Sequence, residues 1–558
     1  MVKRVFKLVY SEIKGLHQAA YLLAFFAFGS QMLALVRDRL LAYSFGAGSE
    51  LDLYYAAFRI PDILFALFAS VLSVYVLLPF VTKARAESSA EAGANVLSQM
   101  FTLFLLVYSG VALILFIAMP FIVTLLFPGF AAEADTLTTL SRILLLQPLL
   151  LGISSLYGVV TQLSQRFVLY AISPLIYNLG IIIGIVLFYP YFGLYGLALG
   201  VILGAVGHLG IQIPLTLGSP LNFKFLKKID WLFIRSVLIF AFPRALTLSL
   251  HQIVLLIFIS MASLMAAGSV SVFQFAFNLQ SVPLAIIGMS YSVAAFPVLA
   301  DLFAKQQREA FCLHVLTAFR HIIFWSLPII ALVIILRAHI VRVVLGSGEF
   351  SWNDTRLTAA MLALFVISLL GQSLMMLLVR TFYAGGNTRI PLYIALSCAG
   401  VSLVGAVSLL ALYNAYPAFQ LFVSSVFRLE FVVGVEVLML AVAFTIATLV
   451  EAGLLLFFAS RLFGFNWSAL RGQISEAMAA AIVAALCAYT ALLFLVPGIN
   501  QNTFIGISLQ GGVAGICGVL GAIFTYYYLG SRELREIYQS FRSRVFKTEV
   551  IAPQSDTP

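Results

Sequence analysis

Charged and polar residues inside long apolar segments are the first candidates for chemistry in this sequence. One stretch, from Asp52 to Asp62, contains both acids, Arg59 and Pro61 among otherwise mostly apolar residues. In a helix, Asp52, Arg59 and Asp62 fall on one face. Pro61 frees a backbone carbonyl about one turn earlier and favours a kink there. A kinked polar face is typical of a helix that lines a cavity, although a purely structural ion pair would also explain these residues.

Two further arginines lie at or within apolar segments. Arg37 and Asp38 are adjacent at the end of the first such segment, and Arg244 lies inside the seventh. An arginine at the centre of a bilayer costs roughly 2.5–3.5 kcal/mol on insertion scales. Such a residue is tolerated where it meets water, a counter-charge or an anionic ligand. We therefore expect Arg37, Arg59 and Arg244 to face one water-accessible central cavity.

The eighth apolar segment is unusually rich in polar side chains. Five of them lie within eleven residues, followed by a proline: Ser271, Gln274, Asn278, Gln280, Ser281 and then Pro283. Amides in a span can simply bridge neighbouring helices. Their density here favours a face that is in contact with water.

Motifs for hydrolytic, metal or nucleotide chemistry are missing from the sequence. It contains no Walker A sequence, no HExxH and no GxSxG. The four cysteines stand singly in apolar stretches, without the spacing of a metal site, and are interpreted as small buried hydrophobes. The sequence therefore predicts no catalytic residue and no metal site.

Composition places the whole chain in a membrane. Of 558 residues, 62% are apolar and only 10% are charged, with a mean hydropathy of +1.07; soluble domains carry roughly 25% charged residues. Spanning a bilayer takes about 20 apolar residues. This rule predicts fourteen spans, near 17–36, 53–81, 97–127, 138–163, 168–189, 194–217, 236–265, 269–299, 311–336, 357–379, 390–412, 431–459, 473–496 and 505–530.

The distribution of basic residues predicts the orientation. With a cytoplasmic N-terminus, 22 of the 32 Lys and Arg residues lie in cytoplasmic segments. Six lie outside: Arg37, Arg39, Arg337, Arg342, Arg356 and Arg428. This asymmetry predicts that both termini are cytoplasmic. It also explains the net charge of +10 as a topology signal, which argues against a nucleic-acid partner.

The longest basic link, 221–235, divides the chain after the sixth predicted span. A short motif occurs twice, as Arg166-Phe-Val-Leu-Tyr170 and as Arg389-Ile-Pro-Leu-Tyr393. The two copies are six spans apart, as duplication of a six-helix unit requires. We predict an N-terminal lobe at 1–220, a C-terminal lobe at 221–460, two additional spans within 461–530 and a cytoplasmic tail at 531–558. The expected fold is an all-α polytopic membrane protein, with two six-helix lobes around a central cavity plus two C-terminal helices.

Several motifs, in this order and spacing, resemble the MurJ/MviN lipid II flippase family of the multidrug/oligosaccharidyl-lipid/polysaccharide exporter superfamily. The matching residues are Arg37 to Ala42, Phe45 to Gly48, Asp52, Ala57 to Asp62, Ser173-Pro174, Tyr177 to Gly180, Gly196 to Gly200, Pro243-Arg244 with Gln252, Gly268 to Ser271, Phe382 to Ala384 and Thr388 to Pro391. The resemblance runs from about residue 20 to residue 460. Well-known members carry arginine at three positions that here are Gln31, Phe65 and Asn278. The cavity of this chain is therefore expected to carry fewer positive charges.

The resemblance implies a function and a set of site residues. It implies a flippase that moves undecaprenyl-pyrophosphate-linked disaccharide-pentapeptide to the outer leaflet of the bacterial cytoplasmic membrane by alternating access. Substrate-binding residues would be Arg37, Asp38, Asp52, Arg59, Asp62, Arg244, Ser271 and Asn278. Hinge residues would be Gly46, Gly48, Pro61, Pro174, Asn178 and Pro283. Partners would be the anionic lipid-linked glycan and membrane lipids, with a monomer as the working unit, no cofactor, and energy from the membrane potential or a monovalent ion.

Other functions remain open from the sequence alone. Within the superfamily, the chain could export another polyprenyl-linked oligosaccharide or a drug-like molecule, although a drug exporter should favour acidic residues in its cavity. A membrane-embedded glycosyltransferase acting on polyprenyl substrates is a different class. It would need an acid or histidine in an external loop, and the only candidate loop is 337–356, with His339, Glu349 and Asp354.

Overall fold

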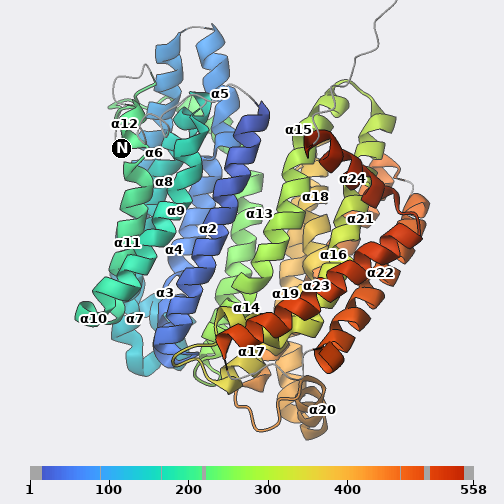
Figure 1. Cartoon of the computed structure of the whole chain (residues 1–558). Helices are drawn as coiled ribbons and strands as arrows, with labels where there is room; N and C mark the ends of the chain where they lie inside the picture. Colours follow the sequence, from blue (N-terminus) through green and yellow to red (C-terminus); the bar gives the residue numbers. More distant parts are fainter. Residues whose placement is uncertain are drawn as a thin grey trace, which may run out of the picture. The chain divides into compact units, whose positions relative to one another are not determined.

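The described part of the chain is helical. The computed structural model describes residues 16–87, 89–164, 166–216, 221–465, 467–495 and 503–545, and these contain no strand. The first helices are α2 (Leu16–Phe45), α3 (Ser49–Ala57), α4 (Arg59–Val71), α5 (Val74–Glu87), α6 (Ala90–Leu126), η1 (Pro128–Glu133), α7 (Ala134–Leu144), α8 (Leu146–Leu163), α9 (Phe167–Ile183), η2 (Gly184–Phe188), α10 (Tyr189–Phe192), α11 (Leu194–Gly210) and α12 (Ile213–Thr216) (Figure 1).

The chain continues with α13 (Trp231–Ser263), α14 (Ser269–Leu284), η3 (Ala285–Met289), α15 (Ser290–Ala304), α16 (Arg308–Val344), α17 (Trp352–Ile367), α18 (Leu369–Ala384), α19 (Arg389–Ala415), α20 (Pro417–Phe427), η4 (Val435–Val437), α21 (Leu438–Phe463), η5 (Trp467–Leu470), α22 (Arg471–Thr490), η6 (Ala491–Leu495), α23 (Phe504–Tyr528) and α24 (Arg532–Val545). The predicted all-α membrane fold is confirmed.

Eleven helical stretches of the described residues are long and apolar enough to cross a membrane. The pair α17 and α18, bent by 41°, makes a twelfth if it counts as one span. The other two predicted spans coincide with α2, which has 30 residues, and with α11, an apolar helix of 17 residues. The count of fourteen stays a prediction.

The described helices belong to two compact units. The first unit comprises Met1–Val282, Val341–Phe365 and Asn387–Glu451, and the second comprises Pro283–Ile340, Val366–Gly386 and Ala452–Pro558. The division predicted from the sequence, with lobes at 1–220 and 221–460, stays a prediction.

Glycines let α9 and α11 pack backbone against backbone in the first unit. A Cβ added to Gly200 would lie 2.4 Å from the Cα of Gly184, and one added to Gly180 would lie 2.2 Å from the Cα of Gly204. Such separations exclude any side chain at these positions. The contact fixes α9, which carries part of the polar site described below.

The second span of the sequence is interrupted where the proline predicts it. Helix α3 ends at Ala57 and α4 begins at Arg59, with Phe58 between them. Pro61 has no N–H to donate to the carbonyl of Ala57, one turn earlier, so the helical ladder lacks a bond at this point. The break allows Arg59 to start a new helix while α3 and α4 continue as one membrane-spanning stretch.

The second unit is built around α15, α16, α18 and the C-terminal helices. Leu336, Ala491 and Ala514 form a buried apolar cluster between α16, η6 and α23. His321 of α16 contacts Glu536 of α24 at 3.2 Å. Small residues again permit close packing, because a Cβ at Gly518 would lie 2.9 Å from the carbonyl oxygen of Ala484. These contacts attach α22, α23 and α24 to α16.

The glycine contact yields a first prediction. Gly200→Ala should lower the free energy of unfolding by about 1–3 kcal/mol, because the new methyl group must push α9 and α11 apart. Gly400→Ala in α19 is the matched control, since a Cβ there meets nothing within 4 Å and alanine is the better helix former by about 1 kcal/mol. Thermal unfolding of the detergent-purified proteins compares them. Equal midpoints for the two variants would contradict the close packing.

Candidate functional site

A buried ion pair on α2 lies at the centre of a polar network within the first unit. The Arg37 guanidinium donates to Asp38 Oδ1 from Nε at 2.9 Å and from Nη2 at 2.7 Å. The Asp38 side chain is only 4% exposed, and that of Arg37 is 21% exposed. Desolvation of a buried pair can exceed the attraction between its charges unless further hydrogen bonds complete it. Both residues have such bonds.

The network continues from Asp38 through α14 to α4. Asn278 Nδ2 donates to Asp38 Oδ2 at 2.9 Å. One turn earlier on α14, Gln274 Nε2 donates to Asn278 Oδ1 at 2.7 Å. The Nη2 group of Arg59 donates to Gln274 Oε1 at 2.5 Å. Two amides therefore connect Arg59, at the start of α4, to the ion pair on α2.

In the other direction the network reaches α9. Arg37 Nη1 donates to Asn178 Oδ1 at 3.1 Å. Asn178 Nδ2 donates to the carbonyl of Pro174 at 3.1 Å and to Ser30 Oγ at 3.3 Å. The bond to Pro174, four residues earlier on α9, holds the Asn178 side chain in place. Four helices thus contribute to one chain of hydrogen bonds.

The end members set the direction of every amide in this chain. A guanidinium only donates and a carboxylate only accepts. Gln274 must therefore accept from Arg59, and Asn278 must donate to Asp38. This leaves the nitrogen of Gln274 to donate to the oxygen of Asn278. Replacing either amide removes one hydrogen bond from each of its two neighbours in the network.

A cavity of about 280 Å³ opens beside the ion pair. Its lining combines charged, amide, phenol and apolar side chains: Gln31, Ala34, Leu35, Arg37, Asp38, Tyr177, Asn178, Asn278, Ser281 and Val282. Two of the three positions where well-known members of the resembling family carry arginine, Gln31 and Asn278, are in this lining. The cavity can hold a small polar or anionic group against a guanidinium.

Arg59 is the least satisfied cation of the network. The residue is buried, with 6% of its surface exposed, and its Nε has no hydrogen-bond partner among the described residues. Its one bond goes to a neutral amide, that of Gln274. The Asp62 carboxylate, one turn later and half-buried, interacts with it electrostatically. A guanidinium has five N–H donors, so Arg59 retains several for a ligand.

Asp52 has a different environment. Its carboxylate accepts hydrogen bonds from the backbone N–H of Gly268 and of Ser271 at 2.7 Å each, and from Ser271 Oγ at 2.5 Å. These donors lie at the N-terminus of α14, where unpaired N–H groups favour an anion. Asp52 and Ser271 thus fix the start of the helix that carries Gln274 and Asn278. Their predicted contact with substrate stays a prediction.

Arg244 lies apart from the cavity beside the ion pair. It is half-buried on α13, and neither Arg244 nor Arg59 is among the residues that line this cavity. The structure therefore joins Arg37 to Arg59 through the network, while a cavity common to these two and Arg244 stays a prediction.

Four of the six predicted hinge residues lie at or near helix breaks or turns, whereas Pro174 and Asn178 lie within α9. Gly46 has a positive φ of 60°, and a Cβ there would lie 2.7 Å from the carbonyl oxygen of Glu349, so the turn after α2 requires glycine. Gly48 precedes α3, and Pro61 follows the break before α4. Pro283 lies near the end of α14, just before the π-helical turn η3. Their role as hinges stays a prediction.

Gln274 and Tyr177 belong to the site although the sequence did not place them among its binding residues. Gln274 was one of the five polar residues of the eighth segment, and its spacing of four from Asn278 puts both on one helical face. Tyr177 adjoins Asn178 and lines the same cavity. A one-turn spacing between amides in a span is the signal that could have identified Gln274.

Catalytic alternatives find no support in the described residues. They contain no group of three His, Cys, Asp or Glu side chains that could hold a metal ion. In the loop singled out for a transferase, Asp354 accepts from the N–H of Ser351 at 2.8 Å, and Ser351 Oγ accepts from the N–H of Asp354 at 3.1 Å. This reciprocal pair caps the start of α17.

Comparison with known sequences confirms the resemblance to the MurJ family. A family model described as "Lipid II flippase MurJ" matches residues 41–512. The chain is 26% identical over 385 residues to a "Probable lipid II flippase MurJ" of Rickettsia prowazekii (strain Madrid E), a match that covers 68% of this chain and 76% of that protein. It is also 26% identical over 389 residues to a protein of the same description from Rhizobium tropici, covering 66% and 71%.

Solved structures are similar in fold. One described as "Lipid II flippase MurJ, inward closed conformation" matches with a TM-score of 0.71 and 21% identity, covering 93% of this chain and 100% of that one. An inward-facing multidrug resistance MATE family transporter of the MOP superfamily matches with a TM-score of 0.64 and 15% identity, covering 78% and 94%. At these identities the likeness concerns the fold alone.

The network yields a second prediction. Asn278→Leu should lower the free energy of unfolding by about 1–3 kcal/mol, because Asp38 loses a donor and Gln274 loses an acceptor. Ser281→Ala is the control, since Ser281 lines the same cavity but its hydroxyl bonds only to the carbonyl of Asn278 on its own helix. Thermal unfolding in detergent measures both. A stability loss for Ser281→Ala as large as that for Asn278→Leu would show that the cavity wall, and not the network, is what matters.

Proposed function

We propose that this chain, which belongs to the lipid II flippase MurJ family, carries a lipid-linked, pyrophosphate-bearing peptidoglycan precursor from the inner to the outer leaflet of a bacterial cytoplasmic membrane. Such a molecule cannot cross hydrocarbon unaided, because its charges and sugars would lose their hydration. The observation that carries the proposal is the hydrogen-bonded network that connects the buried Arg59 to Arg37, which lines a polar cavity. The chain acts as a transporter and not as an enzyme.

Within this proposal, Arg59 is the first cation to contact the cargo. Arg37 uses Nε, Nη1 and Nη2 for Asp38 and Asn178, so a phosphate could engage it fully only after breaking one of these bonds. Arg59 donates a single hydrogen bond, to an amide. Guanidinium groups bind phosphate oxygens through paired N–H donors. Arg59 can therefore accept a phosphate at less cost than Arg37.

Charge balance bears on the energy source. Arg37 and Arg59 are offset by Asp38 and Asp62, so a pyrophosphate adds uncompensated negative charge when it enters. A potential that is negative inside favours outward movement of an anion by about 2.3 kcal/mol per charge and 100 mV, and a bound monovalent cation would offset the same charge. We propose that one of these two sources drives the cycle, with no cofactor.

Orientation and assembly complete the proposal. Both termini lie in the cytoplasm, as the excess of basic residues in the predicted cytoplasmic segments indicates. The proposed working unit is a monomer.

Export of a drug-like cation is the weaker alternative. The charged residues that line the cavity beside α2 are one arginine and one aspartate already bonded to each other. A site for a cationic drug would instead present an unpaired acid.

The third prediction tests the role of Arg59 in cells depleted of their lipid II flippase. Arg59→Lys should retain part of the ability to support growth, whereas Arg59→Met and Arg59→Ala should lose it at unchanged membrane abundance, because an ammonium can still pair with phosphate. Arg142→Met is the control, since Arg142 bonds to the carbonyl of Phe116, outside the network. Full complementation by Arg59→Met would rule out the cargo contact and move it to Arg37.

The fourth prediction concerns topology. Reporters fused to either end of the chain should be active only in the cytoplasm, because the basic segments are retained there. Labelling of a C-terminal cysteine by a membrane-impermeant reagent in intact cells is the independent measurement. Labelling from the periplasm would refute an even number of spans with cytoplasmic termini.

A further inference from the structure

The link between α19 and α21 has structure of its own. Helix α19 ends at Ala415 and α21 begins at Leu438, and both belong to stretches that can span a membrane. Between them lie the eleven-residue helix α20 and the short turn η4. Since both ends of the link join spans, the link lies at a membrane surface.

The link exposes an unusual number of large apolar side chains. Six are more than half exposed: Tyr416, Leu421, Phe422, Val426, Phe431 and Val433. Phe431 is fully exposed, at 102%. Apolar surface in water costs roughly 25 cal/mol per Å², so this patch favours the headgroup and upper acyl region of a bilayer. Aromatic and apolar residues at such a position are typical of interfacial anchors.

The link is held in a defined conformation. The N–H of Leu429 donates to the carbonyl of Ser424 at 2.7 Å, which closes the end of α20 with Arg428 in the left-handed conformation. Arg356 of α17 donates to the carbonyl of Arg428 and lies 3.7 Å from Glu430. Leu429 is buried, with 1% of its surface exposed. The two bonds to the carbonyls of Ser424 and Arg428 hold this segment beside α20 without the Glu430 side chain.

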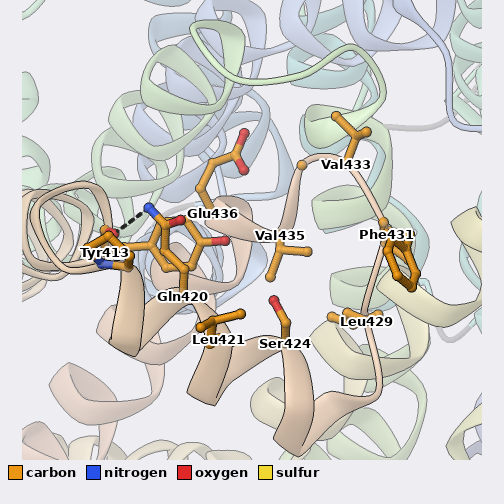
Figure 2. A pocket seen from close by; sticks show the side chains of 12 residues that line it. Tyr413, Gln420, Leu421, Ser424, Leu429, Phe431, Val433, Val435 and Glu436 are labelled. Carbon is orange, nitrogen blue, oxygen red and sulfur yellow. Dashed lines mark hydrogen bonds between the residues drawn. The ribbon is translucent and has the colours of Figure 1, made fainter.

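A pocket of about 490 Å³ lies between α20 and the segment that follows it (Figure 2). Glu436 is the only charged side chain among the described residues that line it. Gln420 also lines it, and since its Nε2 donates to the carbonyl of Tyr413 at 2.8 Å, its Oε1 remains an acceptor. Ser424 Oγ is a third oxygen in the lining (Figure 2).

These oxygens define the chemistry of the ligand. A primary ammonium group has three N–H donors and one positive charge. Glu436 supplies the opposite charge, and Gln420 and Ser424 supply further acceptors in the same lining. The exposed Arg428, directly before the lining residue Leu429, can pair with a phosphate next to the ammonium. Phe431 and Val433, which also line the pocket, offer apolar contact to the rest of a lipid.

We propose that this pocket binds the headgroup of a phospholipid with a primary ammonium, such as phosphatidylethanolamine, while the exposed apolar side chains of the link insert into the surrounding leaflet. The occupant is a membrane lipid and not the transported cargo, because the pocket lies within the same membrane-surface link as the apolar patch. The inference goes beyond transport, and its test needs no cargo.

The experiment titrates the delipidated full-length protein with lipids of identical acyl chains and counts bound lipids by native mass spectrometry. The wild-type protein should bind phosphatidylethanolamine roughly tenfold more tightly than phosphatidylcholine, whose quaternary ammonium has no N–H to donate. Glu436→Gln, which keeps the shape and removes the charge, should abolish this preference. Glu430→Gln is the matched control, because Glu430 lies in the same link but pairs with Arg356 outside the pocket.

Ser424→Leu provides a second route, since it fills the pocket without changing its charge and should also remove the preference. Thermal unfolding shows whether each variant keeps its fold. Retained preference in Glu436→Gln, equal loss in Glu430→Gln, or no preference in the wild-type protein would overturn the proposal. Displacement of phosphatidylethanolamine by a short lysine-containing peptide would assign the pocket to a peptide amine and overturn the lipid assignment.

Discussion

The neutralisation of Asp38 determines how four helices of the first unit meet. A carboxylate that is almost fully buried in a membrane protein needs donors from the chain to offset the cost of its burial. Arg37 supplies two donors and Asn278 a third. Arg37 also donates to Asn178 on α9. Asn278 accepts from Gln274, which itself accepts from Arg59 on α4. The bonds around one carboxylate therefore connect α2, α4, α9 and α14.

The same unit also contains a contact of the opposite kind. Helices α9 and α11 meet through Gly180, Gly184, Gly200 and Gly204, with no side chains between them. Such a contact has one arrangement, since any shift brings backbone atoms into collision or opens a void. Hydrogen bonds between side chains contribute only about 1 kcal/mol each and can be exchanged for bonds to a ligand. A transporter needs both kinds of contact. Here Asn178 of α9 accepts a hydrogen bond from Arg37 and so connects the close-packed helix pair to the side-chain network.

The sequence predicts class and candidate residues better than it predicts contacts. Low charge and long apolar segments indicate a helical membrane protein because lipid tolerates little else. The cost of burying charge points to Arg37, Asp38 and Arg59 for the same reason. The partners could not be predicted: Asp38 and Asn278 are 240 positions apart, and Arg59 and Gln274 are 215 apart. Only packing decides which faces of distant helices meet.

Asp52 shows where local reasoning fails. Asp52 shares a helical face with Arg59, which suggests that they act together, yet the carboxylate of Asp52 caps α14 instead. The free N–H groups of a helix terminus compete with any side chain for a nearby anion, and they can be located only once the fold is known.

The amide at position 278 explains how the site works with fewer cations. An arginine there would place a second positive charge beside Arg37 and Asp38, and the pair would carry excess charge without a ligand. Asn278 instead completes the coordination of Asp38 and passes the network on to Gln274 without adding charge. The ion pair is therefore completed by side chains of the chain itself, and of the two guanidinium groups in the network that of Arg59 has more unused donors among the described residues. The proposed cargo contact at Arg59 therefore needs no break in the ion pair between Arg37 and Asp38.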